Sequence, residues 1–121
     1  MKTGADLITE AKSRIREVTT ADVLAARAGG ETPVLLDVRE PNEFQIARIP
    51  GSTLIPLGQV GARLSEITEA AAGREILVHC KMGGRSAKAV KLLQDNGIPA
   101  KNVKGGILEW IDRVDPSLPK Y

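Results

Sequence analysis

Short apolar runs recur along the chain, separated by longer stretches in which apolar residues have helical spacing. An apolar run of about four to eight residues between turn signals is typical of a strand buried on both faces. Three such runs predict strands at residues 33–38, 52–56 and 75–79, and a smaller strand is predicted at residues 101–105.

The longer stretches carry the start and stop signals of helices. Thr19 and Asp22 have the spacing of a capping box, and Gly29 and Gly30 end the helix that it opens. Pro41 suits the first turn of a short helix. The predicted helices span residues 5–16, 20–28, 41–48, 58–72, 85–96 and 106–113.

Strands that alternate with helices indicate an α/β fold, in which helices cover both faces of a mostly parallel sheet. We find no internal repeat, low-complexity tract or linker, so residues 1–121 are predicted to form a single domain. Within it we expect an N-terminal accessory helix at residues 1–16, a core at 17–115 and an irregular tail at 116–121.

Composition and charge exclude several classes of protein. A net charge of +2 and only three aromatic residues give no support for nucleic-acid binding. The first residues have no apolar segment of a secretory signal, and no run approaches the length of a membrane span. A single cysteine excludes an intramolecular disulfide. One cysteine and one histidine argue against a zinc site, so no metal is predicted, and a cytoplasmic location is expected.

Cys80 is the clearest candidate for chemistry. It directly follows the strand predicted at 75–79, and the segment 81–84 leads into the next helix. In parallel sheets, ligands bind beyond the carboxyl ends of the strands. Gly83 and Gly84 allow positive φ, and a loop that ends at a helix N-terminus directs N–H groups toward an anion. With Lys81 and Arg85 nearby, these groups would lower the thiol pKa and make a nucleophile without a histidine base.

The bland alternative is a buried, inert thiol, which free cysteines often are. The glycine pair and the flanking charges favour the hypothesis that Cys80 is a reactive thiolate. His79 precedes Cys80, and neighbouring residues of a strand point to opposite faces. A Cys–His dyad is therefore not expected, and His79 is assigned to packing.

Three stretches resemble the rhodanese-like sulfurtransferases, in particular the single-domain kind. "LLDVREPNEFQIARIPGSTLIP" is similar to the first family signature, "VHCKMGGRS" to the active-site loop C-x-x-G-x-R-S, and "VKGGILEW" to the closing G-G-x-x-x-W signature. They occur in the expected order and span most of residues 33–110. One departure is Arg48, where many relatives have histidine before I-P-G, and we expect that position to be structural.

The resemblance implies a five-stranded, mostly parallel sheet and a cysteine persulfide mechanism without a cofactor. Cys80 would take sulfane sulfur from thiosulfate or a persulfide donor and pass it to cyanide in vitro, or to a thiol or protein acceptor. The active-site loop would bind substrate, with Arg85 closing the loop and attracting the anionic donor. The loop residues are Lys81, Met82, Gly83, Gly84, Arg85 and Ser86.

Other residues receive supporting roles from the same resemblance. Asp37 is expected to brace the loop and Arg39 to contribute to the rim, and ordinary capping and salt bridging are the alternative for both. Ser86 is expected to cap the helix. Met82 would touch an acceptor or fill space at the loop tip. Phe44 and Trp110 are assigned to the core.

Two alternatives to an enzymatic sulfurtransferase stay open: a persulfide carrier and a phosphatase or arsenate reductase. A stoichiometric persulfide carrier would release its sulfur only to a partner protein in a sulfur relay. The tail "DPSLPKY" resembles the end of rhodanese domains fused behind adenylating enzymes, which hand sulfur to ubiquitin-like carriers.

A phosphatase or arsenate reductase is the second alternative. It would use a C-x5-R loop, whereas Cys80 and Arg85 give C-x4-R and a smaller anion-binding loop. A binding module without activity is the weakest reading, because Cys80 is present.

Basic residues cluster between positions 80 and 104, with only Asp95 opposing them. If several face the loop, they would raise the local concentration of small anions or of an acidic partner. The bland alternative is an ordinary solvated helix face. The cluster comprises Lys81, Arg85, Lys88, Lys91, Lys101 and Lys104.

Overall fold

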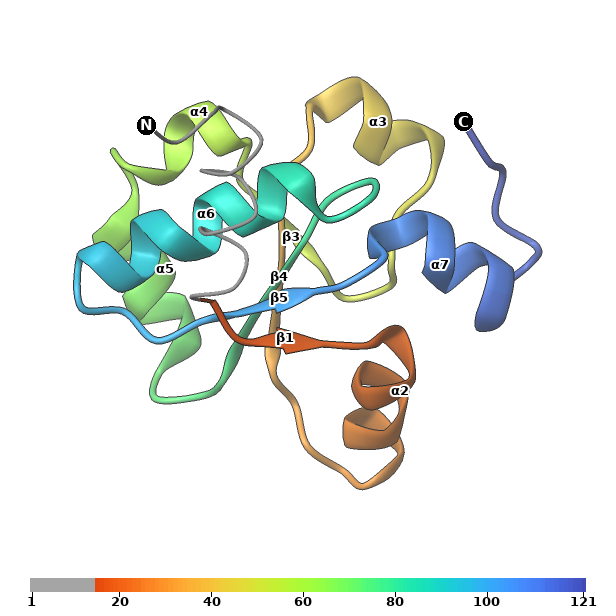
Figure 1. Cartoon of the computed structure of the whole chain (residues 1–121), viewed down its shortest axis with the longest axis horizontal. Helices are drawn as coiled ribbons and strands as arrows, with labels where there is room; N and C mark the ends of the chain where they lie inside the picture. Colours follow the sequence, from red (N-terminus) through yellow and green to blue (C-terminus); the bar gives the residue numbers. More distant parts are fainter. Residues whose placement is uncertain (1–14) are drawn as a thin grey trace, which may run out of the picture.

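A computed structural model describes residues 15–121 of the chain (Figure 1). The helix predicted at residues 5–16 falls almost wholly outside the described residues. Across residues 15–121, no helix has both the length and the apolar character that a membrane span needs.

The centre of the molecule is a five-stranded sheet in which all neighbouring strands are parallel (Figure 1). The order is β1-β5-β4-β2-β3. The strands are β1 (Glu17–Val18), β2 (Val34–Asp37), β3 (Thr53–Leu54), β4 (Ile76–His79) and β5 (Lys101–Val103). The predicted α/β class is therefore confirmed.

The central strands β2 and β4 pair over their whole length, from Val34 opposite Ile76 to Asp37 opposite His79. Both strands consequently end at the same edge of the sheet. All four residues of β4 are buried, as its continuous apolar run predicted. The carboxyl ends of β2 and β4 thus lie side by side, and the chain leaves them toward Arg39 and Cys80.

Helices cover both faces of the sheet and bury two separate apolar clusters. On one face α4 (Leu57–Val60), α5 (Leu64–Ala71) and α6 (Gly84–Asp95) pack on side chains that include Leu36, Val38 and Val78. On the other, α2 (Thr20–Ala28) and α7 (Gly106–Arg113) pack on Leu35, Leu77 and Val103. Burying one such side chain contributes about 1.5–3 kcal/mol.

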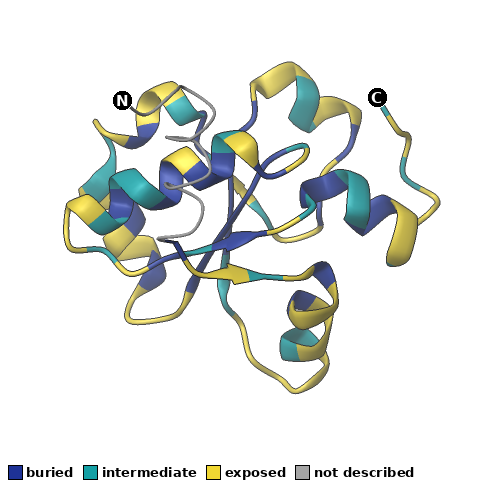
Figure 2. Ribbon diagram, viewed as in Figure 1, coloured by how far each residue is buried: buried dark blue, intermediate teal, exposed yellow. Residues whose placement is uncertain are grey.

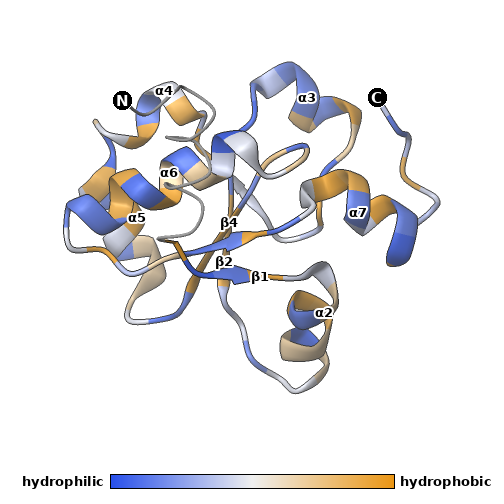
Figure 3. Ribbon diagram, in the orientation of Figure 1, coloured by the Kyte–Doolittle hydropathy of each residue, from blue (hydrophilic) through white to orange (hydrophobic). Residues whose placement is uncertain are grey.

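This two-sided burial follows from the sequence pattern. Successive strand residues point to opposite faces, so the two clusters draw on alternate positions of the same strands. Figure 2 shows buried and exposed residues alternating along α6 and α7, and Figure 3 shows hydrophobic and hydrophilic residues alternating there in the same way.

Most element boundaries agree with the sequence prediction to within two residues. The capping box of Thr19 and Asp22 is present, and α2 ends at Gly29. Pro41 opens the short helix α3 (Pro41–Ile46), which begins beyond the carboxyl end of β2. The helix α7 has the predicted bounds, and the residues after it form no further helix or strand.

Two predictions were wrong in detail. The single helix expected at 58–72 is two helices, α4 and α5, with a break at residues 61–63. Gly58 and Gly61 weaken helix formation there, and the Arg63 side chain bridges the break to Gln59 and Glu66. The strand β1 was not predicted, because two residues without an apolar run give no periodic signal.

Candidate functional site

The loop between β4 and α6 carries the site. Cys80 follows the last residue of β4, and α6 begins at Gly84 after a connection of only three residues. Gly83 has φ = 104° and occupies the N-cap position of α6. Such a φ suits glycine, as the sequence indicated, whereas Gly84 has ordinary helical φ and does not use that freedom.

Two donors in this loop converge on the Cys80 sulfur. The Gly83 N–H lies 3.1 Å from Sγ, and the Ser86 hydroxyl donates to Sγ at 3.3 Å. The residue is only 1% exposed and is part of the larger apolar cluster. Ser86 was expected to cap α6, but Gly83 holds the cap position, so the hydroxyl is free to face the sulfur.

These contacts shift the pKa of the Cys80 thiol. Burial by itself raises the pKa of the Cys80 thiol, because it removes water from the thiolate. Hydrogen bonds from Ser86 and from the backbone of Gly83 and Met82 outweigh burial, so the pKa lies below the ordinary value for cysteine. The thiolate is the nucleophilic form, and the loop therefore favours a reactive sulfur.

The N-terminus of α7 holds the same loop from the other side. The Ile107 N–H donates to the Cys80 carbonyl at 2.9 Å, and the Leu108 N–H donates to the Lys81 carbonyl at 3.2 Å. Gly106 has φ = 59°, and a Cβ there would lie 2.5 Å from both carbonyl oxygens. The two carbonyls thus point at α7 only because position 106 has no side chain.

Asn102 gives the loop one more support. Its buried Nδ2 donates to the Gly83 carbonyl at 3.3 Å and to the Glu17 carboxylate at 2.9 Å. The contributions of Asn102 and Gly106 to the loop were not predicted from the sequence. The motif G-G-x-x-x-W contained the signal for Gly106, but nothing local marked Asn102.

Asp37 and Arg39 form an ion pair, which matches the alternative of ordinary salt bridging rather than the roles of loop brace and rim. Arg39 is fully buried and does not lie on a rim. Its guanidinium donates to the Asp37 carboxylate and to the carbonyls of Glu43 and Ala47. A buried arginine needs such partners, and together they fix α3 against the end of β2.

Asp37 acts on Arg39 rather than on the loop. Its oxygens accept from the Arg39 side chain and backbone N–H, and no hydrogen bond to residues 80–86 is found among the described residues. Burial raises the pKa of the Asp37 carboxyl, but the His79 ring and the Arg39 guanidinium hold it well below its usual range. The carboxylate is therefore ionised at neutral pH.

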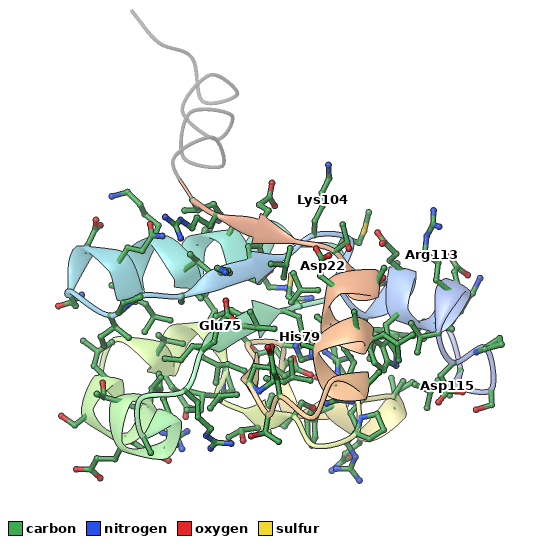
Figure 4. The ribbon with its side chains drawn as sticks, turned by 90° about the horizontal axis from the view of Figure 1, so that it is seen from below. Asp22, Glu75, His79, Lys104, Arg113 and Asp115 are labelled. Carbon is green, nitrogen blue, oxygen red and sulfur yellow. The ribbon has the colours of Figure 1, made fainter. Side chains whose placement is uncertain are left out.

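His79 is fully buried, and Figure 4 shows it inside the molecule. Its Nε2 lies 3.4 Å from an Asp37 oxygen. The hydrogen-bond donors found on the Cys80 sulfur are Gly83 and Ser86, so His79 is not paired with the cysteine in the part of the chain that the structure describes. His79 is packed inside the protein as predicted, but neither ring nitrogen has a hydrogen-bond partner among the described residues.

Arg85 binds Glu43, for which the sequence predicted no role. Its guanidinium grips the Glu43 carboxylate with two hydrogen bonds, at 2.5 and 2.9 Å. Arg85 lowers the pKa of Glu43 to about 2, and Glu43 raises the pKa of Arg85 in turn. Arg85 thus joins α6 to α3, and Glu43 offsets part of the charge expected to attract a donor.

The remaining loop residues lie at the surface. Met82 is 69% exposed at the loop tip. It borders a shallow pocket whose other lining residues come from α7 and the turn before it: Gly105, Leu108, Glu109, Asp112 and Arg113. The Lys81 ammonium lies 4.5 Å from the centre of the Tyr121 ring.

Several members of the basic cluster are paired. Lys91 binds Asp95 and Lys101 binds Glu75, which removes them from any free basic surface. Lys88 and Lys104 are exposed without an ion pair among residues 15–121, and Figure 4 shows Lys104 pointing outward. Lys91 therefore fits an ordinary solvated helix face, whereas Lys101 lies in β5 and is paired there.

The two aromatic residues assigned to the core differ. Trp110 lies in α7 and is buried in the apolar cluster that α2 and α7 form with the sheet, as predicted. Phe44 is only half-buried and belongs to neither cluster, because the exposed α3 turns it toward the Arg48 guanidinium, 4.8 Å from its ring.

Comparisons with known proteins agree with this geometry. The model of the rhodanese-like domain family matches residues 20–113. A chloroplastic rhodanese-like/PpiC domain-containing protein of Arabidopsis thaliana is 43% identical over 72% of this chain. The adenylyltransferase and sulfurtransferase MOCS3-2 of Zea mays is 40% identical over 76% of it. The matches cover 30% and 20% of the lengths of those two proteins.

Solved structures give the same result. The human single-domain sulfurtransferase TSTD1 has a TM-score of 0.68 and 25% identity, over 80% of this chain and 96% of that one. A Rhodopseudomonas palustris protein of unknown function, described as a possible tyrosine phosphatase, has a TM-score of 0.80 and 28% identity, over 100% and 96% of the two chains. With the family model, the sequence relatives and the fold in agreement, the chain belongs to the family of rhodanese-like domains.

Proposed function

We propose that the chain is a sulfurtransferase that carries sulfane sulfur as a persulfide on Cys80. The observation behind the proposal is the set of donors around the Cys80 sulfur, which favours a thiolate without a histidine base. The names of the maize and human relatives, both sulfurtransferases, support the same class of reaction.

The proposed reaction has two steps. The Cys80 thiolate attacks the outer sulfur of thiosulfate, the sulfur–sulfur bond of the donor breaks, and sulfite leaves with the bonding electron pair. In the second step cyanide or an acceptor thiolate attacks the terminal sulfur of the persulfide, and the Cys80 thiolate leaves. The N–H groups that face Sγ would stabilise the charge of both the thiolate and the persulfide.

A relay to a partner protein is the form of this function that we propose for the cell. The maize relative combines sulfurtransferase with adenylyltransferase, and the chain covers only 20% of it. An acceptor protein would approach near the exposed Met82, at the tip of the loop. The prediction of a cytoplasmic location stays a prediction, because the Arabidopsis relative is chloroplastic.

A phosphatase activity is less well supported, although one structural neighbour is described as a possible tyrosine phosphatase. Four residues separate Cys80 from Arg85, and the Arg85 guanidinium is engaged by Glu43. A tetrahedral oxyanion bound at the loop would lack that guanidinium unless the pair opened.

Intact mass spectrometry tests the proposal. The wild-type protein and Cys80→Ser are incubated with thiosulfate, and cyanide is added last. A gain of one sulfur on the wild type only, reversed by cyanide, is the expected result. If the wild type gains no sulfur from thiosulfate or from a persulfide donor, although its thiol is free to alkylation, the proposed function is wrong. Turnover of a phosphatase substrate that Cys80→Ser abolishes would then favour the alternative.

A further inference from the structure

Tyr121, in the segment that the sequence indicated to be an irregular tail, reaches back to the active-site loop. Beyond α7 the chain turns toward α3, as Figure 1 shows. The Tyr121 side chain is half-buried there and contacts residues from three parts of the chain. Its partners are Arg39 after β2, Glu43 in α3 and Lys81 in the loop.

The hydroxyl of Tyr121 lies between a cation and an anion. It accepts from the Arg39 guanidinium at 2.6 Å and donates to the Glu43 carboxylate at 2.9 Å. Burial raises the pKa of the Tyr121 phenol, so the proton needed for the second bond is kept at neutral pH. The carboxylate that accepts this hydrogen bond is the one that binds Arg85.

The ring of Tyr121 supports a second cation. The Lys81 ammonium lies 4.5 Å from the ring centre, within the range of a cation–π contact. Lys81 directly follows Cys80, so the direction of its side chain sets how much positive charge stands beside the sulfur. One side chain therefore contacts Lys81 directly and reaches Arg85 through Glu43.

We propose that Tyr121 is a positioning residue that holds these two cations beside the loop and thereby favours anionic substrates at Cys80. The part of the proposal that names thiosulfate rests on the proposed function. The electrostatic part concerns any reagent that attacks or is attacked by this thiolate, and it is testable without sulfur transfer.

The test compares two alkylating reagents that differ in charge. Iodoacetate is an anion, iodoacetamide is neutral, and both react with the thiolate of Cys80. The ratio of their rate constants at low ionic strength reports the positive potential at the sulfur and cancels changes in thiol reactivity. A variant that only loosened the fold would change both rates together and leave the ratio constant.

We expect the ratio to fall about twofold in Tyr121→Phe, which loses the hydroxyl bonds, and about three- to fivefold in Tyr121→Leu, which also loses the ring. Ser117→Ala is the matched control in the same tail, because Ser117 is exposed and contacts only Asp115 by hydrogen bonding among the described residues. It should keep the wild-type ratio. In the same variants the KM for thiosulfate should rise while kcat stays near the wild-type value.

A wild-type alkylation ratio in both variants overturns the proposal, and Tyr121→Phe decides alone if Tyr121→Leu does not fold. A double-mutant cycle with Lys81→Gln tests whether Tyr121 acts through Lys81. If Tyr121 acts partly through Lys81, the effect of Tyr121→Leu shrinks in the Lys81→Gln background, whereas a full multiplicative effect overturns that route. A lower ratio in a protein that never transfers sulfur would support the role of Tyr121 and refute the proposed function.

Discussion

The sulfur of Cys80 sits in an apolar cluster, where a charge is ordinarily costly, yet its environment favours the thiolate. Local hydrogen bonds explain this, because the Gly83 N–H and the Ser86 hydroxyl both face Sγ. The loop supplies donors within six residues of the cysteine, and no distant base is needed. The loop donors around Cys80, on which the proposed nucleophile rests, therefore come from a short stretch of sequence.

The Ser86 hydroxyl gives the first prediction. Ser86→Ala removes one donor from the thiolate, so the thiol pKa should rise, and alkylation by iodoacetamide at neutral pH should slow about three- to tenfold. The pH dependence of the alkylation rate measures the change. Ser65→Ala, at an exposed position in α5, is the control. An unchanged pH profile in Ser86→Ala would show that the hydroxyl does not stabilise the thiolate.

The Glu43 carboxylate gives a prediction of pH dependence. Its pKa in the folded protein is about 2, against an ordinary value of 4.5. A carboxyl whose pKa is depressed by folding stabilises the fold above the ordinary pKa and loses that contribution as the pH falls from about 4.5 to about 2. Glu43→Gln should therefore have a flatter stability profile over this range than the wild type.

Urea denaturation at a series of pH values checks this prediction. Glu66→Gln, which removes the exposed partner of Arg63, is a matched carboxylate control. Its profile should follow the wild type closely, because exposed pairs contribute little. Equal slopes for Glu43→Gln and the wild type would contradict the assignment.

At the scale of elements, α7 acts on the loop through its backbone. The N–H groups of Ile107 and Leu108 hold the carbonyls of Cys80 and Lys81. This contact requires the absence of a side chain at Gly106, where a Cβ would approach both oxygens to 2.5 Å. A helix that is distant in the sequence thereby fixes the peptide planes on either side of Lys81, next to Cys80.

Gly106→Ala should consequently destabilise the protein by about 2 kcal/mol or more, because it combines a left-handed backbone with the steric conflict. It should also slow alkylation of Cys80. Gly58→Ala is the control, since its Cβ would meet no atom within 4 Å and its φ is ordinary. Thermal unfolding compares the two, and equal melting temperatures would mean that the loop moves aside freely.

The elements were largely predictable because caps and apolar runs are local signals. The helix at α7 and the capping box of Thr19 needed no knowledge of the fold. The break between α4 and α5 and the two-residue β1 were not predicted, because neither has a periodic signal in the sequence. Arg39 was misplaced for a different reason: charged residues are ordinarily exposed, and its buried partners come together only in the folded chain.

At the scale of the whole molecule, the parallel sheet brings separate segments to one edge. The ends of β2, β4 and β5 deliver Arg39, Cys80 and Gly106 to the same side. Arg39 then binds residues at the end of β2, in and after α3, and in the tail. The sequence motifs identify these segments, but the contacts between the segments depend on the topology of the sheet.

The buried Asp37–Arg39 pair gives a prediction at this scale. Asp37→Ala leaves an uncompensated guanidinium inside the protein and should reduce the free energy of unfolding by about 3–5 kcal/mol. Glu66→Ala breaks an exposed pair and should cost about 1 kcal/mol or less. Urea denaturation of both variants tests the contrast. Similar losses would mean that Arg39 finds water or another partner when Asp37 is absent.

The near-complete enclosure of Cys80, at 1% exposure, has a kinetic consequence. With so little of Cys80 exposed, we expect reagents to reach the sulfur mainly when the loop opens, and the observed rate would then be the opening equilibrium multiplied by the intrinsic rate. On the proposed function, the same barrier would shelter a bound sulfur from stray cellular thiols. Delivery would then be confined to acceptors that capture the open form, and the protein would hold its cargo for longer than an exposed persulfide survives.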